Sequence, residues 1–366
     1  MKKTLYILGA IIVCLSCKSP NQETSFNTPG EVLEDTVFTN AFMPRGERFT
    51  GGDGVYSVVL PDGRTVWIFG DSFLGGVTPD MKRLPSTPSY IRNCFVILEG
   101  DSLRTFQQGN PKDFKSMMIP PEVEDGSSGY SELDLWYWPG DGFVANNEFH
   151  LFLSKFFQVD HDDMWGFEFR GTELMSFSLP DFKVINVYQF LETDSVHYGH
   201  AVLETKDYLY IYGLKNMYPY VARAKEGKFT EPWEFYNGSE WVTEAKYAAP
   251  MLEFSGSEQF SVFQWKDTYV MIMQEGDLST DIYSFTSETP YGPWKNKQFL
   301  YKTPLPEGCR ECFTYNALAH PQFTENDQLL ISYNTNSMEF QDHYDNALVY
   351  RPRFIRVPMQ TILPPE

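Results

Sequence analysis

The sequence lacks any long hydrophobic run after its amino terminus, and it has only five cysteines among 366 residues. A helix needs about 20 mostly apolar residues to cross a bilayer, and no stretch of the remaining chain supplies them. A Gly-Lys-Ser/Thr phosphate loop, a glycine-rich dinucleotide fingerprint and a Gly-x-Ser-x-Gly nucleophile elbow are also missing. These absences exclude the commoner nucleotide-binding and esterase classes.

Basic residues are also scarce relative to acidic ones. The chain has 29 Lys and Arg residues against 49 Asp and Glu residues, which gives a formal net charge of −20 at pH 7. A strongly acidic surface disfavours binding to nucleic acid and electrostatic docking to anionic lipid. Acidity alone names no partner, and most of these carboxylates are expected to lie in solvent.

The amino terminus has the pattern of an export signal. Lys2 and Lys3 precede an apolar run at 5–15, which is too short to span a bilayer. Cys17 follows a small residue directly after this run and resembles the acylated cysteine of a bacterial lipobox, whereas Cys14 follows bulky Val13. A plain signal peptide cut nearby, with Cys17 incidental, is the alternative. The polar sequence that follows is expected to be a flexible tether.

Three cysteines remain after this region. Cys309 and Cys312 could form a local disulfide, because an exported protein meets an oxidising compartment, or they could be a free pair. A zinc site would need further ligands, and no second Cys/His pair has suitable spacing. Cys94 lies in an apolar run and is expected to be a small buried hydrophobe.

Short runs rich in aromatic and β-branched residues recur along the chain, while helical periodicity is nearly absent. Five pairs of runs flank polar turns, as in antiparallel hairpins, at residues 54–73, 142–157, 201–214, 260–274 and 320–334. Four are followed by further strand-like sequence, so the repeating unit has about four strands. This predicts an all-β, five-bladed β-propeller with blades near 53–110, 140–192, 198–242, 259–303 and 316–358. A two-sheet sandwich explains the strands equally well, but explains less well the polar clusters at the hairpin starts.

In a propeller the innermost strands start near one mouth of the central channel, so the residues at these starts are expected to form one polar pocket. Asp53 lies in a glycine-rich approach to the first strand, and Asp71 ends the next strand. Two carboxyl groups there supply the acid and the base, or nucleophile, of glycoside hydrolysis. Both could instead be turn residues. The apolar neighbours of Asp71 favour a shielded carboxylate that needs a partner.

Other polar residues near the predicted strand starts are candidates for substrate binding. Trp138 and Asp141 could be a sugar-stacking ring and a third carboxyl, or a core tryptophan followed by a turn. The remaining candidates, each with a structural alternative, are Glu275, His197, His200, His320, Asn334 and Asn336. The acidic loop 160–163 could bind calcium, but its spacing fits no EF-hand, so we expect a solvated loop and a structural calcium ion has no support. We expect no metal and no cofactor.

The segment GGDGVYSVVLPDGRTVWIFGDSF (51–73) resembles a bacterial family of secreted proteins, formerly of unknown function, that is now grouped with the endo-D-arabinanases as glycoside hydrolase family 183. Further matching segments are WYWPGDGFV (136–144), YGHAVLETKDYLYIYG (198–213), YSFTSETPYGPW (283–294) and AHPQFTENDQLLISYNTN (319–336). The resemblance implies a five-bladed propeller that hydrolyses furanosidic arabinan, with catalytic acids at Asp53 and Asp71. Residues 111–135 and those from 337 onward match nothing in this pattern.

The sequence thus predicts a lipoprotein signal peptide at 1–17, a flexible tether at 18–35 and a single propeller catalytic domain at 36–366. The predicted protein is an exported glycoside hydrolase, lipid-anchored to the cell envelope at the outer membrane. A non-catalytic glycan-binding lipoprotein of the same fold is the alternative. The expected partner is a polysaccharide or oligosaccharide, with membrane contact only through the anchor, no nucleic acid, and a monomeric state.

Overall fold

The computed structural model describes residues 31–44, 49–84, 89–99, 102–110, 113–163, 165–191, 193–276 and 278–363. The predicted signal peptide, Cys17 and most of the predicted tether lie outside these residues. None of the helices within the described ranges is long and apolar enough to span a membrane. Antiparallel strands dominate the described chain, which confirms the all-β prediction.

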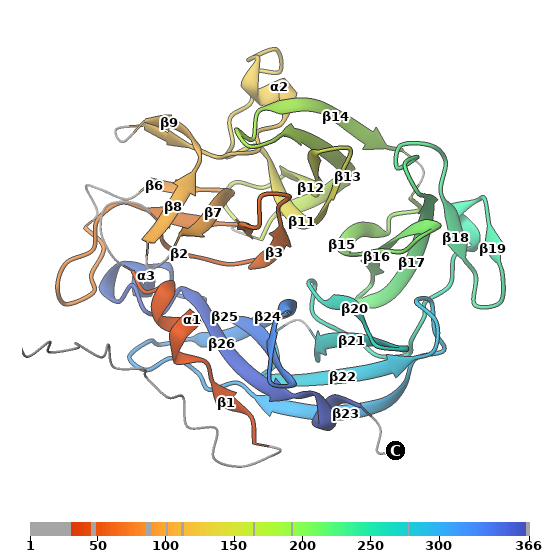
Figure 1. The fold of residues 1–366 in the computed structure, drawn as a ribbon. Coiled ribbons are helices and arrows are strands. Elements are labelled where there is room, and N and C mark those ends of the chain that lie inside the picture. Colours follow the sequence, from red (N-terminus) through yellow and green to blue (C-terminus); the bar gives the residue numbers. More distant parts are fainter. Residues whose placement is uncertain are drawn as a thin grey trace, which may run out of the picture.

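Within the described ranges, five sheets of four or five strands surround a common centre (Figure 1). Sheet 1 contains β3 (Tyr56–Val59), β4 (Thr65–Phe69), β7 (Cys94–Glu99) and β8 (Ser102–Phe106). Sheet 2 contains β11 (Leu135–Ala145), β12 (Glu148–Gln158), β13 (Phe167–Ser178) and β14 (Val184–Phe190). Sheet 3 contains β15 (His197–Glu204), β16 (Tyr208–Lys215), β17 (Tyr218–Lys225), β18 (Glu234–Tyr236) and β19 (Trp241–Val242).

Sheet 4 contains β20 (Ser261–Trp265), β21 (Thr268–Gln274), β22 (Asp281–Ser287) and β23 (Lys295–Lys302). Sheet 5 contains β24 (Cys312–Glu325), β25 (Gln328–Ser337), β26 (Arg351–Pro358) and β1 (Leu33–Glu34). Two smaller sheets contain β2 (Phe49–Gly52), β5 (Ser72–Leu74) and β6 (Ser89–Ile91), and β9 (Gln108–Asn110) with β10 (Asp113–Lys115). The helices are α1 (Thr36–Ala41), α2 (Pro121–Glu124), η1 (Ala245–Tyr247), α3 (Phe340–Asp345) and α4 (Met359–Ile362).

All five expected hairpins form. The antiparallel pairs are β3 with β4, β11 with β12, β15 with β16, β20 with β21, and β24 with β25. The β11–β12 turn shows how sequence directs this pairing. Asn146 and Asn147 adopt φ values of 53° and 63°. Positive φ at both central residues defines the turn whose twist matches that of paired strands, and asparagine tolerates it better than most residues.

The innermost strand of each sheet, nearest the centre in Figure 1, is the one named first above. It contacts the first strand of the next sheet, from β3 through β11, β15 and β20 to β24, which in turn contacts β3. Hydrophobic clusters fill the spaces between neighbouring sheets, for example Phe95 of sheet 1 against Phe149 of sheet 2. The second strands of the sheets read as near-continuous apolar and aromatic runs because they are buried on both faces, whereas outermost strands such as β14 and β23 are largely exposed.

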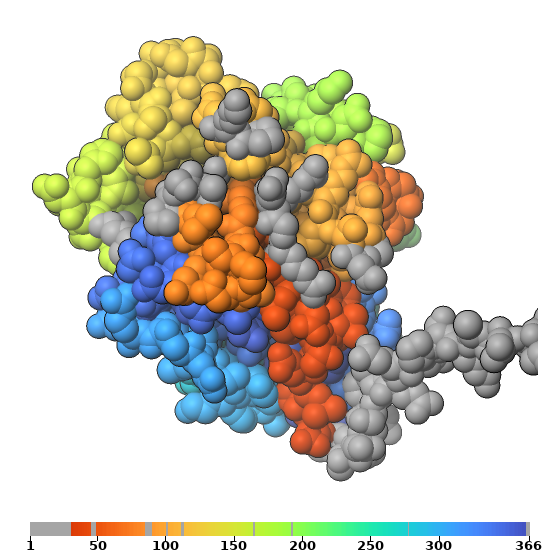
Figure 2. All heavy atoms as spheres, turned by 90° about the vertical axis from the view of Figure 1, so that its left-hand side faces the viewer, coloured from red at the N-terminus to blue at the C-terminus, as the bar shows by residue number. Residues whose placement is uncertain are grey.

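The amino-terminal segment completes sheet 5. Leu33 pairs with Arg356 of β26, and α1 packs on the same strand. Asp35 accepts a 2.6 Å ion pair from Arg356, and both side chains are buried. Its other carboxylate oxygen caps α1 at the amide of Phe38 (2.8 Å). Figure 2 shows this red segment lying against the blue carboxy-terminal part. Residues 33–35, which were predicted to belong to the flexible tether at 18–35, are therefore part of the folded domain. Two residue pairings with β26 and a buried ion pair hold them in place.

The cysteines adopt one of the arrangements left open by the sequence. Cys309 and Cys312 are paired in a disulfide. Cys94 is free and buried, as expected for a small apolar side chain.

Replacing Asp35 with alanine tests the junction of the chain ends. The Asp35→Ala variant leaves the buried Arg356 charge without its carboxylate, so we expect the free energy of unfolding to fall by about 3 kcal/mol. Glu34→Ala is the matched control, since Glu34 is half exposed and lies 4.0 Å from Arg353. Its effect should stay within about 0.5 kcal/mol. Urea unfolding that gives the two variants equal stability would contradict this account.

Candidate active site

One hairpin places Asp53 and Asp71 opposite each other. The register that pairs Tyr56 with Ile68 in sheet 1 is also the register that pairs Gly52 with Ser72 in the small sheet. Asp53 and Asp71 lie between these two pairings. The amide of Asp53 donates to the carbonyl of Asp71 at 3.3 Å. The spacing of the two aspartates along the sequence is therefore set by the pairing of the strands that carry them.

Two glycines make room for this arrangement. A Cβ on Gly70 would lie 2.7 Å from Oδ1 of Asp53, so any side chain there would displace the carboxyl group. Gly54 has a φ of +66°, and a Cβ there would lie 3.1 Å from the side chain of Gln259. The glycine-rich sequence around Asp53 thus serves close approach of chain segments as well as turning.

Donors surround the carboxylate of Asp71. The indole of Trp138 donates to Oδ1 at 3.0 Å, and the hydroxyl of Tyr90 donates to Oδ2. The guanidinium of Arg92 lies 3.6 Å from Oδ2 and stacks over the ring of Trp136. Two neutral donors and a cation are placed to stabilise negative charge on Asp71.

Asp53 has a contrasting environment. Its Oδ2 accepts a hydrogen bond from the hydroxyl of Tyr315. Burial is the main influence on this carboxyl and the negative charge of Asp71 is the next, and together they raise the pKa of Asp53 from 3.8 to about 7. The hydrogen bonds from Tyr315 and Tyr350 act in the opposite direction but do not cancel this rise. Asp53 therefore keeps its proton at pH values where an exposed aspartate is ionised.

Both aspartates face a cavity of about 900 Å³, within the usual size range of ligand pockets. Its wall combines polar groups with many aromatic rings. They include Tyr90, Trp136, Trp138, Phe156, Trp165, Phe167, Phe313, Tyr315, Phe340 and Tyr350. Trp165 is 56% exposed, so its ring is open to solvent at the cavity. His161 and Asp163 of the acidic loop also line this cavity.

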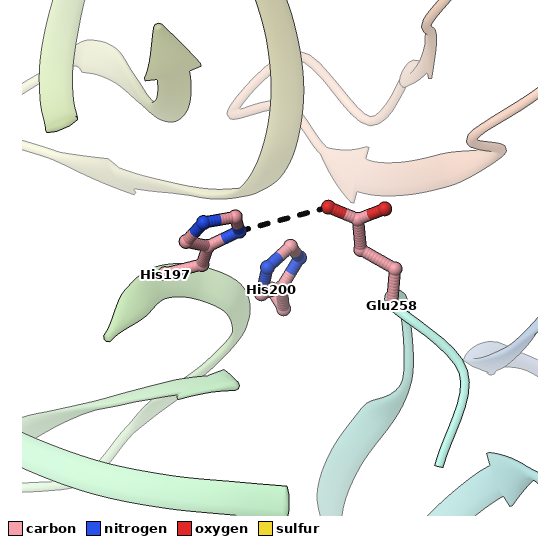
Figure 3. Close-up of side chains that lie close together, drawn as sticks. All are labelled: His197, His200 and Glu258. Atoms are coloured by element: carbon pink, nitrogen blue, oxygen red, sulfur yellow. Dashed lines mark ion pairs between the residues drawn. The ribbon is translucent and has the colours of Figure 1, made fainter. Parts of the chain in front are cut away.

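A second group of titratable side chains faces the same cavity. His200 comes from β15, and Glu258 precedes β20. His197 Nδ1 lies 3.7 Å from Oε1 of Glu258 (Figure 3). Burial lowers the pKa of His200 to about 4, so its imidazole is neutral at pH 7.

The structure therefore brings Asp53, Asp71, Trp138 and His200 together in one cavity. Two other predicted residues, His320 and Asn334, are fully buried outside it. His320 is bonded to Ser57 Oγ (2.6 Å) and Ser332 Oγ (2.9 Å) within the core. The expected start of the fifth hairpin at residue 320 was wrong, because β24 already begins at Cys312. Residues near the beginning of β24 reach the cavity, and His320 lies several residues deeper.

Asp141 and Glu275 also lie away from the main cavity. Asp141 accepts hydrogen bonds from the amides of Gly142 (2.9 Å) and Val202 (3.0 Å), which joins β11 to β15. It lines a separate cavity formed by the five innermost strands. Burial raises its pKa to about 7. Glu275 follows the second strand of sheet 4 and lies 3.4 Å from Lys297. Both residues were predicted to line the pocket, because the sequence did not show their position along their strands relative to the cavity.

Several cavity residues were missed or undervalued from sequence. Glu258 occupies the position before the inner strand of sheet 4 that Asp53 occupies in sheet 1, and that equivalence is a usable signal. Tyr315 and Asn336 are joined by a 3.0 Å hydrogen bond from Asn336 Nδ2 to the tyrosine hydroxyl. Tyr90 lies in β6 of the small sheet beside Asp71, and Arg92 directly follows that strand. Asn336 was a candidate from the sequence, whereas no local motif marks Tyr315, Tyr90 or Arg92.

Comparison with known families assigns the chain to one family. Residues 35–359 match the model of a family described as a domain of unknown function, DUF5005, and the chain belongs to that family. A comparison with curated protein sequences finds no match.

A solved structure from Bacteroides ovatus ATCC 8483, described as a "putative hydrolase", is 26% identical, with a TM-score of 0.77 over 89% of this chain and 90% of that chain. A GH43_1 enzyme from Xanthomonas citri complexed with xylotriose aligns over 85% of this chain and 87% of that chain, at 15% identity and a TM-score of 0.47. The α-L-arabinofuranosidase PaAbf62A from Podospora anserina, complexed with cellotriose, aligns over 85% and 92%, at 9% identity and a TM-score of 0.45.

The Asp53→Asn variant tests the environment of this carboxyl through stability. A carboxyl whose pKa is about 7 when folded and 3.8 otherwise binds more protons in the folded state between these values. The contribution of Asp53 to the stability of the wild type should therefore fall as pH rises from about 4 through 7. Asparagine cannot ionise, so Asp53→Asn should unfold at a higher temperature than the wild type at pH 8, with the difference shrinking towards pH 4.

Asp62→Asn, in the exposed turn of the same hairpin, is the control. Thermal unfolding monitored by circular dichroism at pH 4, 6 and 8 provides the measurement. A difference between Asp53→Asn and wild type that does not change with pH would show that Asp53 titrates normally.

Proposed function

We propose that this protein is a glycoside hydrolase in which Asp53 is the general acid and Asp71 the base or nucleophile. The observation that carries the proposal is the contrast between two opposed carboxyls in one cavity. Glycosidases use such a pair, one carboxyl protonated near neutral pH and the other ionised. Burial and a neighbouring charge raise the pKa of Asp53 to about 7, and three donors surround Asp71.

We infer that the five sheets are the blades of a five-bladed propeller, with β1 joining the first and last parts of the chain in sheet 5. Support comes from the successive contacts of β3, β11, β15, β20 and β24. The cavity then lies at one end of the propeller axis, where all five sheets contribute residues. That arrangement suits a substrate that enters from outside and reaches both aspartates.

The proposed substrate is a furanosidic polysaccharide of the arabinan type. The support is the resemblance of the Asp53 and Asp71 segment to endo-D-arabinanases, together with the description of the Bacteroides ovatus protein as a hydrolase. Aromatic rings along the cavity offer apolar faces for sugar rings, and Trp165 is open enough to reach a chain that extends beyond the cavity.

Activity assays on plant and mycobacterial arabinans test this function. Asp53→Asn and Asp71→Asn should each lower kcat by at least about 10²-fold, since each removes a group that transfers a proton or attacks the sugar. In the wild type, kcat/KM should fall as pH rises through about 7, where Asp53 loses its proton. Products are analysed by mass spectrometry.

The matched control is again Asp62→Asn, whose side chain is in an exposed turn and bonds Arg64. Full activity of both aspartate variants would overturn the catalytic assignment. If wild-type protein binds arabino-oligosaccharides saturably, does not cleave them and is unaffected by Asp53→Asn, then the protein is a glycan-binding lipoprotein and not an enzyme.

We also propose that the protein is exported and anchored to the cell envelope by a lipid on Cys17, and that it acts as a monomer. The support for export and for the lipid anchor is the sequence of residues 1–18. The Cys17→Ser variant should lose labelling by radioactive palmitate and leave the membrane fraction. Cys14→Ser is the control and should keep both. Unchanged labelling of Cys17→Ser would show that this cysteine carries no lipid.

A further inference from the structure

His197, His200 and Glu258 form a compact cluster beside the proposed catalytic pair. Each offers one nitrogen or oxygen atom, and these three atoms lie within 4.8 Å of one another. Figure 3 shows the three side chains converging, the histidines from β15 and the glutamate from the segment before β20. The proposed hydrolysis by Asp53 and Asp71 does not explain why these three side chains lie so close together.

An irregularity in β15 brings the two histidines together. Residues three apart on a regular strand point to opposite faces of the sheet. The register of β15 against β16 shifts between Tyr198 and Ala201, which marks a bulge. Gly199 within it has a φ of +103°, and a Cβ there would lie 2.4 Å from the Cβ of Phe152. The backbone is therefore shaped so that His197 and His200 reach one point.

His200 has a polar atom with no partner. The residue is 5% exposed, and in the described part of the chain its Nε2 is buried without a hydrogen bond. A buried imidazole nitrogen left unpaired costs free energy, and such groups are rare in folded proteins. The neighbouring ion pair of His197 with Glu258 does not supply the missing partner. A ligand that accepts a nitrogen lone pair would.

We propose that His197, His200 and Glu258 bind a divalent transition-metal ion, with zinc as the best match. Two imidazoles and a carboxylate are one of the ligand sets of three-ligand zinc sites, with ligand distances of about 2.0–2.2 Å. Calcium and magnesium prefer oxygen ligands alone, so nitrogen ligands select against them. This proposal differs from the sequence prediction of no metal. The sequence does not show that Glu258 lies beside the two histidines in the folded protein.

The site would face the cavity. His200 and Glu258 line it together with Asp53 and Asp71, and the negative charge of Glu258 contributes to the raised pKa of Asp53. Three protein ligands leave one position of a tetrahedral ion for water or for a hydroxyl group of a molecule in the cavity. The ring of Phe169 lies 3.6 Å from that of His197 (between centroids) and restricts its orientation.

Metal content tests the proposal without any substrate. Full-length protein without a polyhistidine tag is stripped with chelator, dialysed against zinc or calcium and analysed by mass spectrometry. We expect one zinc per chain and no calcium. Cobalt substitution should give the visible absorption bands of a tetrahedral ion. His200→Ala and Glu258→Gln should each weaken zinc binding at least about 10-fold in calorimetric titrations.

His161→Ala is the matched control, since His161 also lines the cavity but belongs to a different cluster, 3.3 Å from Asp134. It should keep one zinc per chain. If His200→Ala fails to fold, His197→Ala replaces it, because His197 is only partly buried. Absence of zinc binding in the wild type, or equal binding in the cluster variants, would overturn the site. Neither result depends on whether the protein cleaves a polysaccharide.

Discussion

The opposition of two carboxyls on one buried hairpin is the central constraint of this molecule. A single hairpin fixes Asp53 and Asp71 opposite each other through backbone hydrogen bonds, so their backbones cannot move apart without breaking the strand pairing. The surrounding residues give the two carboxyl groups different environments. Asp71 receives donors from a tryptophan, a tyrosine and an arginine, whereas Asp53 is shielded and keeps its proton. The chemical asymmetry thus originates in the pairing of two strands.

Sequence patterns predicted the local structure of the fold well. Alternating apolar runs and polar turns identified all five hairpins, because turn residues and strand residues have opposite conformational preferences. The closing strand β1 was assigned to a tether. Leu33 and Glu34 are too few to form a recognisable pattern, and their partner lies at the far end of the chain. Long-range pairing of a very short strand leaves no local signal.

The site was predicted in part for a related reason. Asp53 and Asp71 lie on one hairpin, so their proximity follows from local pairing. His320 was misplaced because depth along an inner strand depends on where that strand begins, and the aromatic residues before it already belong to β24. Tyr315 and Glu258 join the cavity through packing between sheets. Such convergence depends on the relative placement of whole sheets, which a single sequence does not specify.

The location of β1 has a consequence for how the molecule is assembled. Sheet 5 needs residues 33–34 and β26, the earliest and almost the latest parts of the described chain. The buried charge of Arg356 is neutralised when it pairs with Asp35 from the other end of the described chain. Sheet 5 therefore cannot be completed before β26 has been synthesised. In a chain that still lacks β26, the strand β1 and the carboxylate of Asp35 have no partners there, so the ring of sheets closes only when the last strand is added.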